Sequence, residues 1–349
     1  MEPLDPEVMV RQVGRLAQDL RELTHPFDEQ VQRLNDLSSI KKVYLIGTGD
    51  SFHASCAAEM AYETFADVDC TAMSAFRFLE YGSRRLQNET TLVIGVSASG
   101  ATPRALEAVQ RAKEYGCLTI GITGKTGSKL AEVVDQTVTV QLPDNERSPG
   151  IRTFQASLIG LLLIAIRLGQ GREQADLIRA ELIGLANVID ATKTSIADSC
   201  AEVARMIADS TSLLVVGSGP SYGTALFSAA KLNEAAGILA VGQDLEEWWH
   251  VERFAYPTDM PVFVIAPPGR SHARASEFAM TANRLGRRVI AVVHEKDSEI
   301  GRHARVVLPV RGEVREEFSP LLYHLFAGYV ASHVARNLGR LLFQSGTTN

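Results

Sequence analysis

The densest set of chemically active side chains lies in the segment Ser97-Ala98-Ser99-Gly100-Ala101-Thr102. Its three hydroxyl groups fall between an apolar run that ends at Val96 and a helix that we expect to begin near Pro103. Hydroxyl groups donate to phosphate oxygens, and a helix N-terminus presents backbone N–H groups to an anion. The segment therefore predicts an anion cradle, although simple N-capping of the helix explains the same residues.

A second candidate cradle occurs earlier in the chain and is repeated. The stretch Gly47-Thr48-Gly49-Asp50-Ser51-Phe52-His53-Ala54 returns 170 residues later as Gly217-Ser218-Gly219-Pro220-Ser221-Tyr222-Gly223-Thr224. Each copy follows a β-branched and aliphatic run, and predicts a strand, a glycine turn and a helix start. Ser51 is the candidate anion ligand of the first copy, with His53 as a weaker one. The repeat indicates one unit built twice.

The two halves differ in the loop that follows their next strand. In the second half this loop is Ala266-Pro267-Pro268-Gly269-Arg270-Ser271, with fewer hydroxyl groups and two prolines that lack backbone N–H donors. We expect this copy to bind anions poorly and the second half to supply other groups.

Lys231 and Glu234 are the strongest candidates for those other groups. They lie three residues apart on the helix expected after the second glycine turn, so they share one of its faces. A carboxylate so placed can move a proton, but a surface ion pair is the ordinary alternative. Glu247 and His250 follow in a stretch that holds both tryptophans of the chain, and this stretch suits an interface equally well.

Alternating strand and helix patterns must position these residues. The runs of β-forming residues predict an α/β fold with two doubly wound parallel sheets, whose loops meet at the carboxyl edge. The expected strands are 43–46, 68–73, 92–96, 118–122, 136–140, 213–216, 262–265, 289–293 and 306–308. Helical patterns cover 7–37, 154–206 and 319–341. The expected parts are 1–40 (helical), 41–170 (first domain), 171–208 (connector) and 209–349 (second domain).

Composition excludes several classes of protein. A formal charge of −6 without a dense basic stripe argues against a nucleic-acid binder. The four cysteines show no metal-ligand spacing, so we expect no metal. The N-terminal residues lack the pattern of a signal peptide, and the longest apolar run, near 158–166, is short for a membrane span. These patterns favour a cytoplasmic protein without membrane partners.

Together these motifs resemble the SIS (sugar isomerase) domain family in its tandem form. The resemblance is greatest to the isomerase half of glucosamine-6-phosphate synthase and to stand-alone sugar-phosphate isomerases and deaminases. It rests on Asp50-Ser51, on Ser97-x-Ser99-Gly100-x-Thr102, and on Ala230-Lys231-Leu232-Asn233-Glu234 followed by Glu247 and His250. It covers nearly all of the chain from about residue 8 to 335, and implies two flavodoxin-like SIS domains related by internal duplication.

The resemblance also implies roles for single residues. The phosphate of a sugar phosphate would be held by Ser51, Ser97, Ser99 and Thr102, in turns that contain Gly49 and Gly100. Glu234 would move a proton between C1 and C2 beside Lys231, and Glu247 would join the substrate-binding set. The histidine that matches His250 is associated with ring opening and reaches in from a partner subunit, which implies a homodimer with shared active sites. No cofactor is implied.

The expected function is isomerisation of a hexose or hexosamine 6-phosphate between aldose and ketose, or isomerisation with loss of the amine as ammonia. Two alternatives remain: a fructosamine-6-phosphate deglycase and a non-catalytic regulator that binds sugar phosphates. The lysine, glutamate and histidine at matching intervals favour an enzyme. Ala98 and Ala101 replace the glutamine and glutamate typical of the synthase, and no lysine follows Lys296. The motifs therefore do not identify the sugar.

Overall fold

The computed structural model describes residues 4–82, 90–169, 171 and 175–344 of the chain. These residues divide into two compact units. We call the first the β1–β5 unit (18–145 and 152–185) and the second the β6–β10 unit (1–17, 146–151 and 186–349). Helix α1 (Glu7–Gln32) and helix α7 (Ala175–Ile207) each contribute residues to both units.

The β1–β5 unit contains a parallel sheet with the strand order β2-β1-β3-β4-β5. Its strands are β1 (Lys42–Gly47), β2 (Asp69–Ser74), β3 (Thr91–Ser97), β4 (Leu118–Thr123) and β5 (Gln136–Thr139). Its helical elements are α2 (Asp50–Ala66), α3 (Ala75–Arg77), η1 (Phe78–Gly82), α4 (Pro103–Glu114), α5 (Lys129–Val133) and all but the first residue of α6 (Ile151–Leu168). This strand order is that of flavodoxin-like folds.

The β6–β10 unit repeats this order as β7-β6-β8-β9-β10, again fully parallel. Its strands are β6 (Ser212–Gly217), β7 (Leu239–Asp244), β8 (Pro261–Ala266), β9 (Arg288–His294) and β10 (Val306–Val310). Its helices include α8 (Pro220–Ala236), α9 (Leu245–His250), α10 (His272–Arg284), α11 (Ser298–Gly301), α12 (Pro320–Tyr323) and α13 (Leu325–Asn337). Short turns η3 (Glu252–Phe254), η4 (Glu316–Phe318) and η5 (Leu342–Gln344) complete it.

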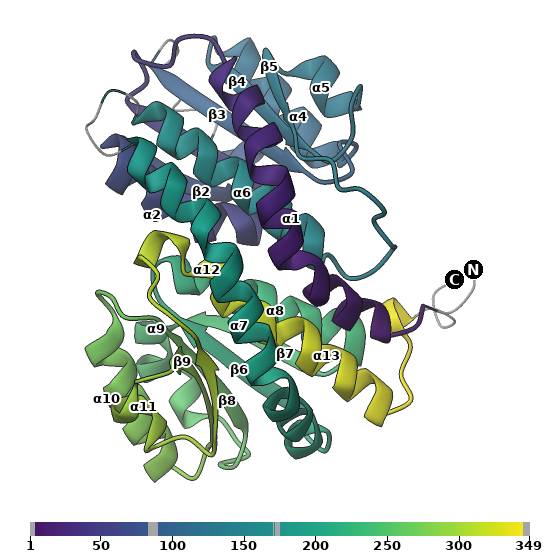
Figure 1. The fold of residues 1–349 in the computed structure, drawn as a ribbon, viewed down its shortest axis with the longest axis vertical. Coiled ribbons are helices and arrows are strands. Elements are labelled where there is room, and N and C mark those ends of the chain that lie inside the picture. Colours follow the sequence, from purple (N-terminus) through teal and green to yellow (C-terminus); the bar gives the residue numbers. More distant parts are fainter. Residues whose placement is uncertain (1–3, 83–89, 170, 172–174, 345–349) are drawn as a thin grey trace. The chain divides into compact units, whose positions relative to one another are not determined.

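The central strands are buried along their whole length because both sheet faces are covered. Every residue of β3 and of β8 is buried, as expected for parallel strands between helical layers. In the β6–β10 unit, α10 packs on β8 and β9, while α8 packs on β6, β7 and α13. Figure 1 shows this sheet between α10 and α11 on one side and α8 and α13 on the other. The expected doubly wound α/β fold is confirmed.

The sequence missed one strand and misjudged two helical segments. The segment expected to be helical over 154–206 contains two helices, since α6 ends at Leu168 and α7 begins at Ala175. Strand β7 was not predicted from the sequence, because it lies at a sheet edge and exposes Leu239 and Val241, so its short run lacks continuous apolar character. The closing helix, expected over 319–341, is broken at His324 into α12 and α13 and ends at Asn337.

Candidate active site

The hydroxyl loop that joins β3 to α4 is held together by its own side chains. Ser97 Oγ and Thr102 Oγ1 lie 3.0 Å apart within hydrogen-bonding distance, and Ser99 Oγ accepts the backbone N–H of Ala101 at 3.2 Å. Thr102 is the N-cap residue of α4, yet its side chain makes no capping hydrogen bond. The N-capping alternative is therefore wrong for Thr102, whose hydroxyl is turned to Ser97 instead.

Gly100 allows this loop to pack against the loop that follows β4. Its φ of +64° lies in the left-handed region, and a Cβ there would lie 2.6 Å from Thr123 Oγ1 and closer still to Ser128. Ser128 Oγ in turn donates to Thr123 Oγ1 at 3.2 Å. Two backbone hydrogen bonds, Leu130 N–H to Gly100 O and Gly124 N–H to Ala98 O, join the same loops. The hydroxyl loop is thus fixed before any ligand binds.

Thr123 and Ser128 were not identified as candidates from the sequence. They follow β4 in a segment that contains Gly124 and Gly127, and this hydroxyl- and glycine-rich pattern after a strand was the available signal. Their side chains lie next to Gly100 of the hydroxyl loop, where a Cβ on that residue would point.

Ser51 lies at the neighbouring strand end. Strand β1 pairs with β3, so the glycine turn after β1 and the hydroxyl loop after β3 share one edge of the sheet. There the connections from β1 and β3 leave in opposite directions, which is where ligands bind in such folds. Gly49 adopts φ 57° and ψ −130° before α2 begins. His53 Nδ1 lies 3.6 Å from Asp50 Oδ1 in the first turn of that helix.

The second glycine turn has the same backbone but different side-chain contacts. Gly219 adopts φ 58° and ψ −133°, within three degrees of Gly49 in both angles. Ser221, the counterpart of Ser51, is 2% exposed, and Ser218 Oγ donates to Asp244 Oδ2 at 2.6 Å. The hydroxyls of this turn are buried or engaged within the unit.

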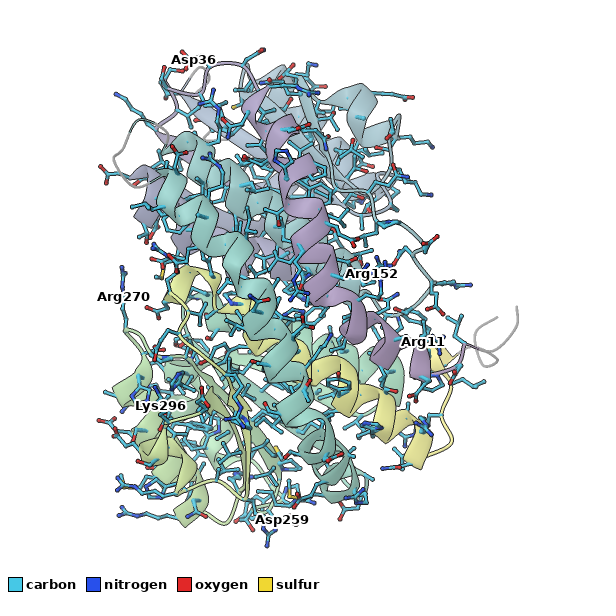
Figure 2. All side chains as sticks on the ribbon, in the orientation of Figure 1. Arg11, Asp36, Arg152, Asp259, Arg270 and Lys296 are labelled. Carbon is cyan, nitrogen blue, oxygen red and sulfur yellow. The ribbon has the colours of Figure 1, made fainter. Side chains whose placement is uncertain are left out.

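A carboxylate of the chain itself lies at the loop after β8. The backbone N–H of Arg270 is 3.2 Å and 3.3 Å from the two carboxylate oxygens of Glu316, and a Cβ on Gly269 would come within 2.7 Å of them. The side chain of Arg270 is exposed (Figure 2). The position next to this loop is therefore filled by an internal anion, a contact that no local motif predicts.

Lys231 and Glu234 form a pair that is largely removed from water. The Lys231 side chain is fully buried and the Glu234 side chain is 32% exposed, with Nζ and Oε2 2.6 Å apart. Lys231 Nζ also lies 5.0 Å from the centre of the Phe227 ring, a cation–π distance. A buried ammonium requires such partners. The surface ion pair considered from the sequence is thus wrong for Lys231.

Glu247 and His250 are exposed on helix α9. The His250 side chain is 70% exposed, and its Nε2 lies 3.5 Å from Glu246 Oε1. Trp248 is fully buried and packs edge-on against Phe278 at 4.4 Å between ring centres. Trp248 therefore anchors α9 in the core, while Trp249 is only partly buried and the opposite face of the helix meets solvent.

Metal binding, cysteine reactivity and membrane insertion can each be examined in the described part of the chain. No group of three or more His, Cys, Asp or Glu side chains there could hold a metal ion. All four cysteines are buried as free thiols, and burial raises the pKa of Cys56 to about 12. Helix α6 is long and apolar enough to cross a membrane, but 83% of it is buried within the protein, as in a core helix.

A family model decides the classification. The model described as the SIS domain matches residues 36–167 and again residues 206–338. The chain belongs to the SIS domain family. Its two SIS domains account for the two parallel sheets and for the repeated glycine turn, so the resemblance expected from the motifs is confirmed.

Individual relatives refine this picture of a tandem SIS protein. The chain is 29% identical over 308 residues to a glutamine–fructose-6-phosphate aminotransferase (isomerizing) of Gloeobacter violaceus, over 86% of this chain and 50% of that protein. The chain thus spans about half the length of this curated relative.

Two solved structures share the fold. The C-terminal domain of a glucosamine-fructose-6-phosphate aminotransferase from Francisella tularensis has a TM-score of 0.83 and 16% identity, covering 97% of this chain and 98% of that one. The tagatose-6-phosphate ketose/aldose isomerase of Escherichia coli has a TM-score of 0.80 and 15% identity, covering 99% and 98%.

Proposed function

We propose that this SIS protein binds a phosphorylated sugar, a hexose or hexosamine 6-phosphate, and isomerises it between aldose and ketose by proton transfer between C1 and C2. The observation that carries the proposal is the Lys231–Glu234 pair, a buried ammonium held 2.6 Å from a partly exposed carboxylate. The names of the relatives support the substrate class, since they act on fructose or tagatose 6-phosphate.

We assign phosphate binding to the hydroxyl loop of the β1–β5 unit. Ser97, Ser99 and Thr102 lie at the N-terminus of α4, where backbone N–H groups and the helix dipole favour an anion. Ser51 occupies the first turn of α2 after the adjacent strand. Because this loop is already held by its own hydrogen bonds, phosphate binding costs little conformational entropy. The binding energy of the phosphate can then help to orient the reacting carbons.

We assign proton transfer to Glu234. Enediol formation next to a carbonyl needs one carboxylate that takes a proton from one carbon and returns it to the other. The Glu234 carboxylate reaches solvent, whereas Lys231 beneath it does not. In this assignment Lys231 holds the carboxylate in position and supplies the positive charge that offsets the enediolate as it forms.

The test compares Glu234→Gln with a matched control, Glu277→Gln. Glu277 also lies three residues from its cationic partner, Arg274, but on the exposed surface. With hexose and hexosamine 6-phosphates as substrates, proton exchange at C2 is followed by NMR and ammonia release is measured in parallel. We expect Glu234→Gln to lower kcat by about 10²- to 10⁴-fold with affinity changed only a few fold, and Glu277→Gln to behave as the parent.

The outcomes separate the candidate reactions. Exchange without ammonia identifies an isomerase, and ammonia release identifies a deaminating isomerase. Release of a substituted amine from a fructosamine 6-phosphate identifies a deglycase. Tight binding of sugar phosphates without any turnover in the parent protein contradicts catalysis and leaves a regulator.

The proposal includes a homodimer in which His250 serves the active site of the partner subunit. Its 70% exposure leaves it accessible to a second copy of the chain. Light scattering measures the oligomeric state, and mixing two inactive variants, Glu234→Gln and His250→Ala, tests the sharing of sites. If sites are shared, mixed dimers contain one site with both native residues, so activity returns; no recovery after subunit exchange contradicts this arrangement.

A further inference from the structure

An open cavity of the β6–β10 unit, lined mostly by polar residues, includes none of the residues assigned above. Its volume is about 600 Å³, and its lining includes His272, His294, Lys296, Asp297 and Glu313. These residues follow β8, end β9 or follow β9 and β10, so the cavity opens at the carboxyl edge of the sheet. Lys296, labelled in Figure 2, marks its position just beyond β9.

His294 presents a buried hydrogen-bond donor to this cavity. The residue is 8% exposed, and its Nδ1 lies 3.2 Å from the backbone N–H of Lys296, which donates to it. The neutral imidazole therefore carries its proton on Nε2. Within the described part of the chain Nε2 has no hydrogen-bond partner; Glu313 Oε1, at 3.5 Å, lies beyond normal hydrogen-bond length.

The same tautomer argues against a metal on His294. A metal bound at Nε2 requires the proton on Nδ1, and Nδ1 faces an N–H donor. The unpaired Nε2–H of His294 can be satisfied by an acceptor oxygen of a ligand, but not by a metal cation.

The unpaired donor of His294 carries the argument for a ligand. An unpaired buried donor costs free energy that a ligand can recover.

The remaining polar groups set the charge of the site. Asp297 is already engaged, because its two oxygens accept from His272 at 2.6 Å and from the backbone N–H of Ile300 at 2.9 Å. The lining carries three carboxylates (Asp297, Glu299 and Glu313) and the single ammonium of Lys296. This negative balance disfavours a phosphate group.

A ligand hydroxyl group matches the two groups that meet here. It accepts from the His294 donor and at the same time donates to the Glu313 carboxylate. We propose that this cavity binds a neutral polyhydroxylated compound, an unphosphorylated sugar or alditol, at a site distinct from the hydroxyl loop. The proposal does not depend on the reaction assigned above.

Calorimetry with the full chain tests it, with glucose and sorbitol as neutral probes and glucose 6-phosphate as the charged one. We expect saturable binding of a neutral probe, which His294→Gln or Glu313→Gln weakens by about three- to tenfold for each lost hydrogen bond. The matched controls are His25→Gln and Glu29→Gln, which break an exposed histidine–glutamate pair of α1 and leave binding unchanged. Binding must also persist in Ser99→Ala with Thr102→Ala, which alters the hydroxyl loop.

Glu313→Gln keeps the test independent of folding defects. The Glu313 side chain is 79% exposed, so we expect the unfolding temperature of the parent and a polyol affinity reduced several fold. The proposal is overturned if no neutral probe binds, if His294→Gln leaves binding intact, or if glucose 6-phosphate binds more tightly than glucose in a manner that His294→Gln abolishes.

Discussion

The loop after β3 and the loop after β8 occupy equivalent places in two copies of one fold, yet they present different groups. The glycine turns that precede them agree within three degrees. After β3, hydroxyls and a glycine with positive φ form the loop to which we assign anion binding. After β8, two prolines remove donors and Glu316 fills the space beside the loop. The two copies keep the same backbone at their glycine turns but place different groups at the loops that follow β3 and β8. We therefore expect only the loop after β3 to bind an anion.

Replacement of Gly100 or Gly269 by alanine should show the largest difference in stability between the two copies. Gly100→Ala places a Cβ at positive φ against Ser128 and should cost about 1–3 kcal/mol in unfolding free energy, together with loss of sugar-phosphate binding. Gly269→Ala meets only the end of the flexible Glu316 side chain, so we expect a smaller loss. Chemical denaturation of both variants measures the difference.

A double variant checks the cause. Adding Glu316→Ala to Gly269→Ala should restore part of the lost stability, because the clash disappears with the carboxylate. Equal losses in Gly100→Ala and Gly269→Ala would contradict the view that the two loops are held by different contacts.

Removal of hydroxyls should have the next largest effect. Ser99→Ala combined with Thr102→Ala removes two donors from the proposed phosphate site, and we expect KM for a sugar phosphate to rise on the order of a hundredfold, since hydrogen bonds to charged groups contribute most. A control in the other copy, Ser218→Ala, removes a hydroxyl of the glycine turn that is already bonded to Asp244 and should leave KM unchanged. Steady-state kinetics decide between these outcomes.

A further difference lies in the helices that follow the glycine turns. Glu59 occupies in α2 the tenth position that Ala229 occupies in α8. Burial, partly opposed by a hydrogen bond from the Ala72 backbone, raises the pKa of Glu59 to about 7. The folded state therefore binds a proton more tightly than the unfolded state, and stability should fall as pH rises from about 4.5 to 7.

Glu59→Gln should flatten that part of the pH profile. Thermal unfolding of the parent and the variant at pH 5 and pH 8 measures the effect, and we expect the variant to gain relative stability at the higher pH. A parallel pH dependence in both proteins would show that Glu59 does not titrate in this range.

The sequence predicted most of the elements but not all of the contacts. Strands such as β3 and β8 could be recognised because burial on both faces demands continuous apolar runs. Strand β7 could not, since an edge strand with exposed Leu239 and Val241 lacks that signal. The pairing of Lys231 with Glu234 followed from helical spacing, whereas the burial of Lys231 did not, because spacing says nothing of what packs around a helix.

By itself the sequence determined the duplication, the parallel sheets, the glycine turns and the hydroxyl loop, because local pattern and chain direction place these features. Only the tertiary structure showed which side chains from distant parts of the chain lie beside these loops. Glu316 lies 46 residues beyond Arg270, and Asp297 lies 25 residues beyond His272, to which it is hydrogen-bonded. Contacts between residues so far apart depend on packing of the whole unit, which no local pattern encodes.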